Sequence, residues 1–120
     1  MTNGTASGNN LIASNTIDGF GNAGVWIDQG VGASVVGASQ IYGNLFYDLA
    51  YGVEHDQRTN ATSFGWACFS NAFGAITSAH VSGITENFDP VTLTGDPFVD
   101  HTDYELNTTS GAGALVRGLR

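Results

Sequence analysis

An internal repeat is the feature of this sequence that most constrains its fold. Residues 11–19 align with residues 35–43 at an offset of 24, so that Ile12 matches Val36 and the apolar positions recur. A fixed spacing within short apolar segments, interrupted by loops of variable length, is typical of repeat proteins. In these proteins each repeat buries its apolar side chains only by stacking on the next one.

Two further alignments extend the repeat. Residues 24–28 match residues 52–56 at an offset of 28, and a looser third copy runs from Cys68 to Gly74. The alignment predicts a polar ladder at a tight turn, in which side-chain amides and hydroxyls bond to one another and to the backbone. Its expected members are Asn15, Ser39 and Asn71.

The composition favours strands and turns over helices. The chain has 17 glycines and two prolines, and its short apolar segments are rich in Val, Ile and Phe. Glycine and asparagine supply the positive-φ conformations that tight turns need, and β-branched and aromatic residues fit pleated strands. We therefore expect a mostly-β chain with many turns.

The closing segment resembles a known family. The stretch 91–100, with Asp96-Pro97-Phe98 at its centre, is followed by Asp103-Tyr104-Glu105-Leu106 and by the small residues 110–114. This pattern resembles the end of the right-handed parallel β-helix (pectate-lyase-like) superfamily, and the likeness spans about residues 9–116. That superfamily contains lyases, hydrolases, epimerases, adhesins and phage tail proteins, so membership does not fix a function.

The repeat and the resemblance together predict the fold. We expect one all-β domain over residues 1–120, a short right-handed single-stranded parallel β-helix (solenoid). It would have a polar lead at 1–8, about three coils at 9–90 and a closing segment at 91–120. No cap precedes residue 9, which predicts either a fragment of a longer protein or a first coil buried against another copy.

Charge limits the partners. Eleven acidic residues against three arginines give a net charge of −8, which repels phosphate backbones and makes nucleic acid an unsuitable partner. Acidic polysaccharides are repelled too unless a divalent cation such as Ca²⁺ bridges them. No apolar run approaches the ~20 residues of a membrane span, so no membrane partner is expected.

Asp28 and Asp56 are the first candidate site. They end equivalent segments and would lie one strand spacing apart, roughly 5 Å. Two carboxylates at that distance suit a Ca²⁺ site or a pair of glycosidase carboxylates, and the alternative is two solvated acids that diverge at a turn. No other cofactor is indicated.

The stretch 54–58 is the densest ionisable cluster. Alternation places His55 on the inner face, as a core-edge residue or as a general base. Arg58 is the one basic candidate outside the tail for lyase-type proton abstraction, and its alternative is a surface ion pair with Glu54.

An outward aromatic face is the candidate ligand surface. Trp26 is expected to point outward beside Asp28, with Glu54 and Tyr51 nearby. Such a surface stacks on sugars while carboxylates bond their hydroxyls, and the alternative is packing under loops or against another chain. The C-terminal cluster is expected to cap turns, or else to bind a cation: Asp96, Asp100, His101 and Asp103.

Two functions follow from these features. The first is a non-enzymatic surface module, extracellular if it belongs to a larger protein, with weak carbohydrate binding. The alternative is the C-terminal part of a carbohydrate-active enzyme, a pectate-lyase-like lyase or a glycosidase. Self-association is also expected, because the uncapped first coil exposes the apolar residues Leu11, Ile12 and Ile17.

Overall fold

The structure, a computed structural model, describes residues 5–7, 10–19, 21–29, 34–36, 39–57, 66–84, 86–107 and 111–119. These residues form eleven strands and one helix. The elements are β1 (Thr5–Ser7), β2 (Leu11–Ala13), β3 (Thr16–Asp18), β4 (Ala23–Gln29), β5 (Ser34–Val36), β6 (Ser39–Tyr42), β7 (Leu45–Gln57), β8 (Trp66–Phe69), β9 (Ala72–Ser82), β10 (Asn87–Phe88), β11 (Val91–Leu93) and α1 (Gly111–Gly118).

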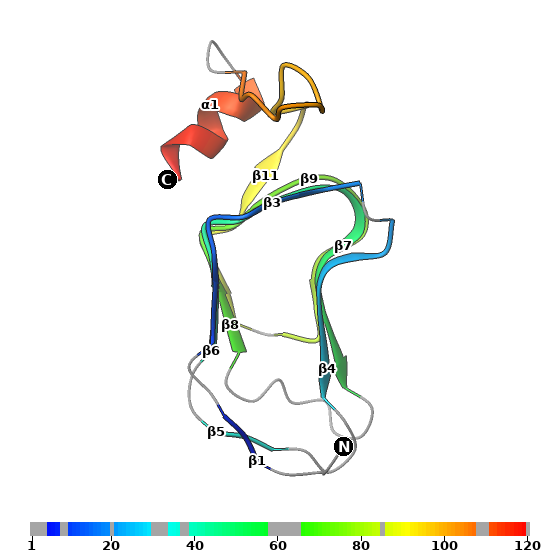
Figure 1. Cartoon of the computed structure of the whole chain (residues 1–120), viewed down its shortest axis with the longest axis vertical. Helices are drawn as coiled ribbons and strands as arrows, with labels where there is room; N and C mark the ends of the chain where they lie inside the picture. Colours follow the sequence, from blue (N-terminus) through cyan, green and yellow to red (C-terminus); the bar gives the residue numbers. More distant parts are fainter. Residues whose placement is uncertain are drawn as a thin grey trace.

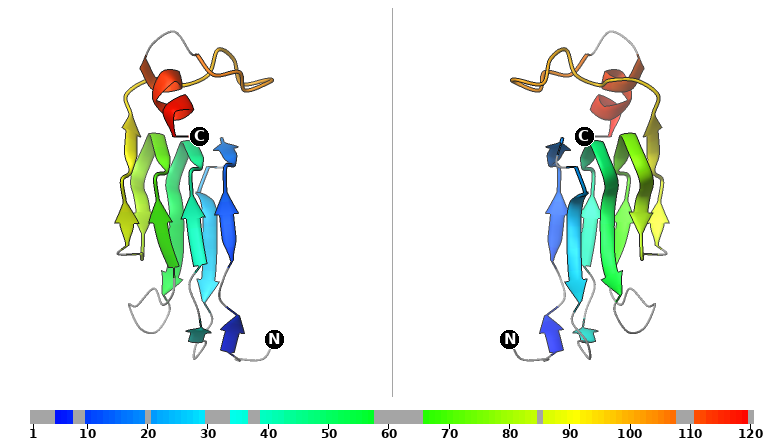
Figure 2. Two further views of the ribbon diagram at one scale, coloured as in Figure 1. Left: turned by 90° about the vertical axis from the view of Figure 1, so that its left-hand side faces the viewer. Right: turned by 90° about the vertical axis from the view of Figure 1, so that its right-hand side faces the viewer.

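The strands form three parallel sheets. A four-stranded sheet has the order β10-β8-β6-β2, and a five-stranded sheet has the order β11-β9-β7-β3, with β4 also paired to β7. A two-stranded sheet joins β1 to β5. The larger two sheets face each other in Figure 1, and Figure 2 shows their strands side by side, blue at one edge and yellow at the other.

The main core lies between the two larger sheets. It is built from residues in matching register, so that each buried side chain rests on one from the neighbouring strand. Phe46 pairs in register with Phe73, and their rings stack at a centroid distance of 5.4 Å. The other fully enclosed members include Ile41, Leu49, Val53 and Cys68. Burial of this apolar surface is the main favourable contribution to folding.

A tight turn joins the two sheets each time the chain passes from the four-stranded to the five-stranded sheet. One residue at the turn has a positive φ on every pass: Ser14 (57°), Gly43 (63°), Ser70 (50°) and Asp89 (49°). Glycine, Asp and Ser tolerate this left-handed conformation better than β-branched residues do. The turn is followed by Asn15, Asn44 and Asn71 on the first three passes and by Pro90 on the last.

The three asparagines form a ladder. The Asn44 side-chain oxygen accepts the backbone N–H of Asn15 at 2.9 Å, and the Asn71 side-chain oxygen accepts that of Asn44 at 2.9 Å. The amide nitrogens donate to carbonyls of the preceding pass, from Asn44 to Ile12 at 2.9 Å and from Asn71 to Ile41 at 2.8 Å. Asn44 and Asn71 are almost fully buried, and the ladder supplies hydrogen bonds to buried backbone at the corner.

A second core lies under the helix. Ala112 and Val116, four residues apart on one face of α1, pack on the outer face of the five-stranded sheet. Their contacts include Leu45, Ala72 and Leu93. Figure 1 shows α1 beside β11 at the C-terminal part of the molecule.

The predicted fold class is wrong. We expected an all-β single-stranded β-helix, whereas the described residues form three separate parallel sheets and an α-helix. The closing segment 91–120 contains that helix, where a tail of small residues was expected. The reason lies in Ala112 and Val116: four residues apart, they give a helix an apolar face for the second core, which the small-residue composition of 110–114 concealed.

One repeat alignment is confirmed and the other is wrong. The offset of 28 holds, because Val25 pairs with Val53 and Trp26 with Glu54. The offset of 24 fails, because Ile12 pairs with Ile41, 29 residues later. Consequently Asn44, not Ser39, follows Asn15 in the ladder; Ser39 instead accepts from the backbone N–H of Asn10 at 3.2 Å.

The Asn44→Ala substitution tests the ladder. It would leave buried backbone groups of neighbouring passes without their side-chain partner, and we expect a loss of about 3 kcal/mol in the free energy of unfolding. The matched control is Asn15→Ala, since Asn15 is exposed at the end of the ladder and its amide donates to Ala13 in its own turn. Urea unfolding of both variants measures the difference, and equal losses would contradict the role of the ladder.

Candidate functional site

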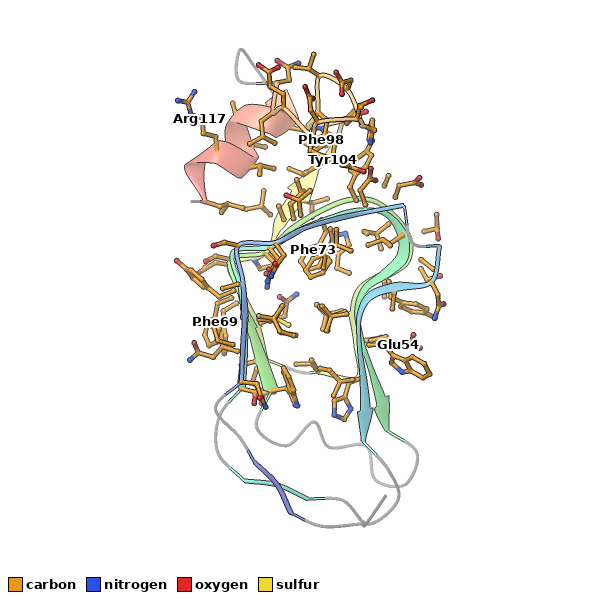
Figure 3. The ribbon with its side chains drawn as sticks, viewed as in Figure 1. Glu54, Phe69, Phe73, Phe98, Tyr104 and Arg117 are labelled. Carbon is orange, nitrogen blue, oxygen red and sulfur yellow. The ribbon has the colours of Figure 1, made fainter. Side chains whose placement is uncertain are left out.

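The most exposed tryptophan lies on the outer face of the five-stranded sheet. Trp26 on β4 pairs in register with Glu54 on β7, and Glu54 pairs with Ser82 on β9. Trp26 is 59% exposed, while the adjacent Val25 belongs to the partly buried residues against the core. Figure 3 shows Glu54 projecting away from the interior that holds Phe73. Neighbouring strands lie about 4.8 Å apart, so these three residues form one continuous row.

Asn22 links this row to the backbone of Tyr51, the third predicted ligand residue. Its carbonyl accepts the backbone N–H of Tyr51 at 2.8 Å, and its side-chain amide donates to Glu54 Oε2 at 3.5 Å. Tyr51 is half-buried and lies three residues before Glu54 on β7. We call the surface formed by Trp26, Glu54, Ser82 and Asn22 the Trp26 face.

The Trp26 face combines three kinds of ligand contact. An exposed indole offers a flat apolar surface, which suits the C–H face of a sugar ring or an aromatic group. A carboxylate and an amide beside it accept and donate hydrogen bonds, and the Ser82 hydroxyl does both. Of the three predicted ligand residues, Trp26 and Glu54 are register partners on this surface, and the backbone of Tyr51 bonds to that of Asn22 beside it.

The predicted catalytic residues are placed differently. His55 points into the core opposite Ile27 and is only 4% exposed, so a substrate on the outer face cannot reach its ring. The backbones of Asp28 and Asp56 are register partners on β4 and β7. Their side chains, and all of Arg58, lie outside the described residues, so the carboxylate pair stays a prediction.

A second polar cluster lies at the C-terminal loop. His101 contacts Asp18 Oδ2 through Nδ1 and Asp96 Oδ2 through Nε2, both at 2.7 Å. Its ring also lies near those of Tyr47 and Phe98, at centroid distances of 5.7 and 5.1 Å. We call this arrangement the His101 clamp. It fastens the loop after β11 to the end of β3, across the outer face of the sheet.

Electrostatics keep the clamp charged. The contacts with Asp18 and then Asp96 raise the pKa of His101 from 6.5 to about 9, so the imidazolium persists at neutral pH. Partial burial acts to raise the pKa of Asp96, but the hydrogen bonds from His101 and from the Phe98 N–H outweigh it and lower that pKa. With both ring nitrogens engaged, His101 serves as a structural link and not as a general base.

The clamp also needs space beneath it. Gly74 on β9 lies in register between Tyr47 and Leu93, and a Cβ added at Gly74 would come within 2.8 Å of the Tyr47 ring. The absence of a side chain at Gly74 therefore leaves room for the Tyr47 ring, which packs beside His101. Burial raises the pKa of Tyr47, with smaller contributions from Asp96, Asp48 and Asp18.

Sequence reasoning found only half of this cluster. The prediction that its acids cap turns agrees with the hydrogen bonds: Asp96 accepts the Phe98 N–H at 3.0 Å, and Asp100 accepts the Thr102 N–H at 2.8 Å. The bond between His101 and Asp18 was missed, because the two residues are 83 positions apart and no local pattern links them.

Within the described part of the chain, no group of three or more His, Cys, Asp or Glu side chains is arranged to hold a metal ion. No helix among those residues is long and apolar enough to cross a membrane. No protein-family model matches the chain, and neither curated proteins nor solved structures show significant similarity to it. The resemblance of the closing segment to the pectate-lyase-like superfamily therefore stays a prediction.

The His101 clamp predicts a specific pH dependence. Because folding raises the pKa of His101, its stabilisation is complete below pH 6.5 and is lost as the pH rises through about 9. The lowered pKa of Asp96 adds an acid limit, since that contribution is lost as the pH falls below 3.8. Thermal unfolding should show His101→Gln less stable than the parent near pH ~6 and equal to it above pH about 9.

The variant His80→Gln is the contrasting control for this experiment. Burial lowers the pKa of His80, so any stabilisation from its neutral ring is present above pH 6.5 and is lost in acid, the opposite trend. A stability difference for His101→Gln that does not change between neutral and alkaline pH would contradict the charged clamp.

Proposed function

We propose that this protein is a non-enzymatic surface module that binds neutral carbohydrate weakly through the Trp26 face. The observation that carries the proposal is the alignment of a 59% exposed tryptophan with a carboxylate and a hydroxyl, on three adjacent strands. A sugar chain lying across these strands would stack on Trp26 and place its hydroxyls over Glu54 and Ser82.

Charge supports a neutral ligand. The chain carries a net charge of −8, and Glu54 adds a carboxylate at the centre of the face, so an acidic sugar would be repelled. Weak affinity follows from the shape of the face, because one exposed ring on a sheet surface buries far less of a ligand than a pocket does.

The placement of the histidines supports a binding role without catalysis. His55 is buried in the core, the His80 ring stacks on that of Phe73 at a centroid distance of 4.7 Å, and both ring nitrogens of His101 contact carboxylates. These three rings are therefore engaged away from the Trp26 face, where a proton would be transferred to or from a bound sugar.

The Trp26→Ala substitution tests the proposal directly. Loss of the stacking surface should weaken binding of neutral oligosaccharides at least about tenfold, in line with the ~1.5–3 kcal/mol carried by a buried aromatic contact. Isothermal titration or glycan-array binding measures the change. The matched control is Tyr42→Ala, which removes a 46% exposed aromatic ring from the four-stranded sheet and should leave binding unchanged.

Tryptophan fluorescence gives a second measurement. The chain has two tryptophans, so Trp66→Phe leaves Trp26 as the single reporter. A neutral glycan that binds the proposed face should shift the Trp26 emission. If the parent binds a glycan, Trp26→Ala binds it with the same affinity and the emission does not shift, the binding site lies elsewhere. If no glycan binds at millimolar concentration, the proposed function is wrong.

A carbohydrate-active enzyme is the second candidate function, and the register pairing of Asp28 with Asp56 favours it. Two carboxylates one strand apart suit the roughly 5 Å separation of retaining glycosidases. We expect the double substitution Asp28→Ala with Asp56→Ala to abolish any cleavage of a polysaccharide, measured as released reducing ends. Cleavage that persists in this variant would show that these residues are not its catalytic pair.

A further inference from the structure

The outer face of the four-stranded sheet carries three aromatic residues in one row, which we call the aromatic stripe. Tyr42 on β6 pairs in register with Phe69 on β8, and Phe69 pairs with Phe88 on β10. The residue before Tyr42, Ile41, is fully buried in the core, so alternation along the strands turns this row outward. Figure 3 shows Phe69 on the outer side of its sheet, across the molecule from Glu54.

Much of this surface is open to solvent. Tyr42 is 46% exposed and Phe88 is 50% exposed, and Leu11 on the same outer face is 65% exposed. The Phe69 and Phe88 rings stack at a centroid distance of 5.2 Å, which covers one side of the Phe88 ring and leaves the other side accessible. Single exposed apolar residues are normal on a protein surface, whereas a continuous apolar patch marks an interaction site.

Two exposed acids flank the Phe88 end of the stripe. The Glu86 carbonyl accepts the Cys68 N–H at 2.8 Å and so continues the ladder of β10, which places Glu86 on the same outer face as Phe88, two residues later. Asp89 follows Phe88 directly, at the corner turn. Among the described residues of this sheet and its corner turns none is basic, so this end of the stripe attracts cations.

The neighbouring sheet shows how an outer apolar row is covered in this protein. Leu45 and Ala72 pair in register on the outer face of the five-stranded sheet, and Ala112 and Val116 of α1 pack on them. The helix uses one apolar face for this contact and carries Arg117 directly after Val116. The single described helix is engaged there, so no described helix covers the aromatic stripe.

We infer that the aromatic stripe is a docking surface for an amphipathic helix of a partner protein, with arginine or lysine at one end of the apolar face of that helix. Apolar side chains of the partner would cover the stripe, as α1 covers the neighbouring sheet. Its basic side chain would lie on the accessible side of the Phe88 ring, near Glu86 and Asp89. There the ring and the carboxylates both attract a cation.

Charge favours a basic partner over the alternatives. A second copy of the chain would bring together two stripes with the same acids, in molecules that each carry a net charge of −8. Nucleic acid and anionic lipid surfaces are repelled for the same reason. The inference does not depend on the proposed function, because the stripe and the Trp26 face lie on the outer sides of different sheets.

Fluorescence anisotropy with a pair of labelled helical peptides tests the inference. One peptide has leucine on one face and arginine on the other, and its counterpart has glutamate in place of every arginine. The full chain should bind the arginine peptide and not the glutamate peptide. Phe88→Ser should weaken this binding at least about tenfold, because it removes the ring that the cation and the apolar face both contact. Asp89→Asn should weaken it about threefold at low salt, an effect that added salt should remove.

The matched control for Asp89→Asn is Asp48→Asn. Both aspartates are exposed and have a positive φ, 49° at Asp89 and 55° at Asp48, and asparagine tolerates this conformation equally well. Both substitutions remove one negative charge, but Asp48 lies on β7 in the other sheet. Asp48→Asn should therefore leave peptide binding unchanged.

A second stripe variant protects the test against misfolding. Tyr42 is exposed and its ring lies outside the core, so Tyr42→Ala should keep the fold, as judged by circular dichroism and thermal unfolding, and still weaken peptide binding. Four results would each overturn the inference: no binding of the arginine peptide at millimolar concentration, equal binding of both peptides, binding that no stripe variant weakens, or equal losses for Asp89→Asn and Asp48→Asn.

Discussion

The hydrogen bonds at the corner between the two larger sheets support the rest of the structure. Each pass of the chain makes the same left-handed turn, and on the second and third passes a buried asparagine after the turn bonds to the backbone of the previous pass. Asn44 is central, since its side chain contacts Asn15, Ile12 and Asn71. Because this ladder fixes the relative height of successive passes, it also fixes which apolar residues stack in the core and which side chains align on the outer faces.

The Trp26 face and the apolar core rows both follow from that register. Trp26, Glu54 and Ser82 come from three passes, and only matching register brings them into one row. The same register places Ile12 and Ile17 at the start of the apolar rows. A shift of one residue would turn every one of these side chains to the opposite face of its sheet. The proposed ligand surface and the apolar core rows are therefore two consequences of one alignment.

The C-terminal segment stabilises the stack from outside. The helix α1 covers part of the outer sheet face through Ala112 and Val116, and the His101 clamp joins the loop after β11 to the end of β3. Figure 3 shows Phe98 and Tyr104 together in this region. A charged contact thus joins β3 to the C-terminal loop, and the raised pKa of His101 leads us to expect its stabilisation to be lost as the pH rises from 6.5 through about 9.

The sequence by itself determined the strand-rich character, the pairing of residues 24–28 with 52–56, the inward position of His55 and the acidic charge, because these depend on local alternation and composition. It misassigned the partner of Ile12 and the helix at Gly111–Gly118. Tertiary structure decided the ladder through Asn44 and the bond from His101 to Asp18, since both join residues far apart in the chain. Loop lengths vary between passes, so local similarity cannot specify which residues meet, and the corner ladder and the packed core together select the register.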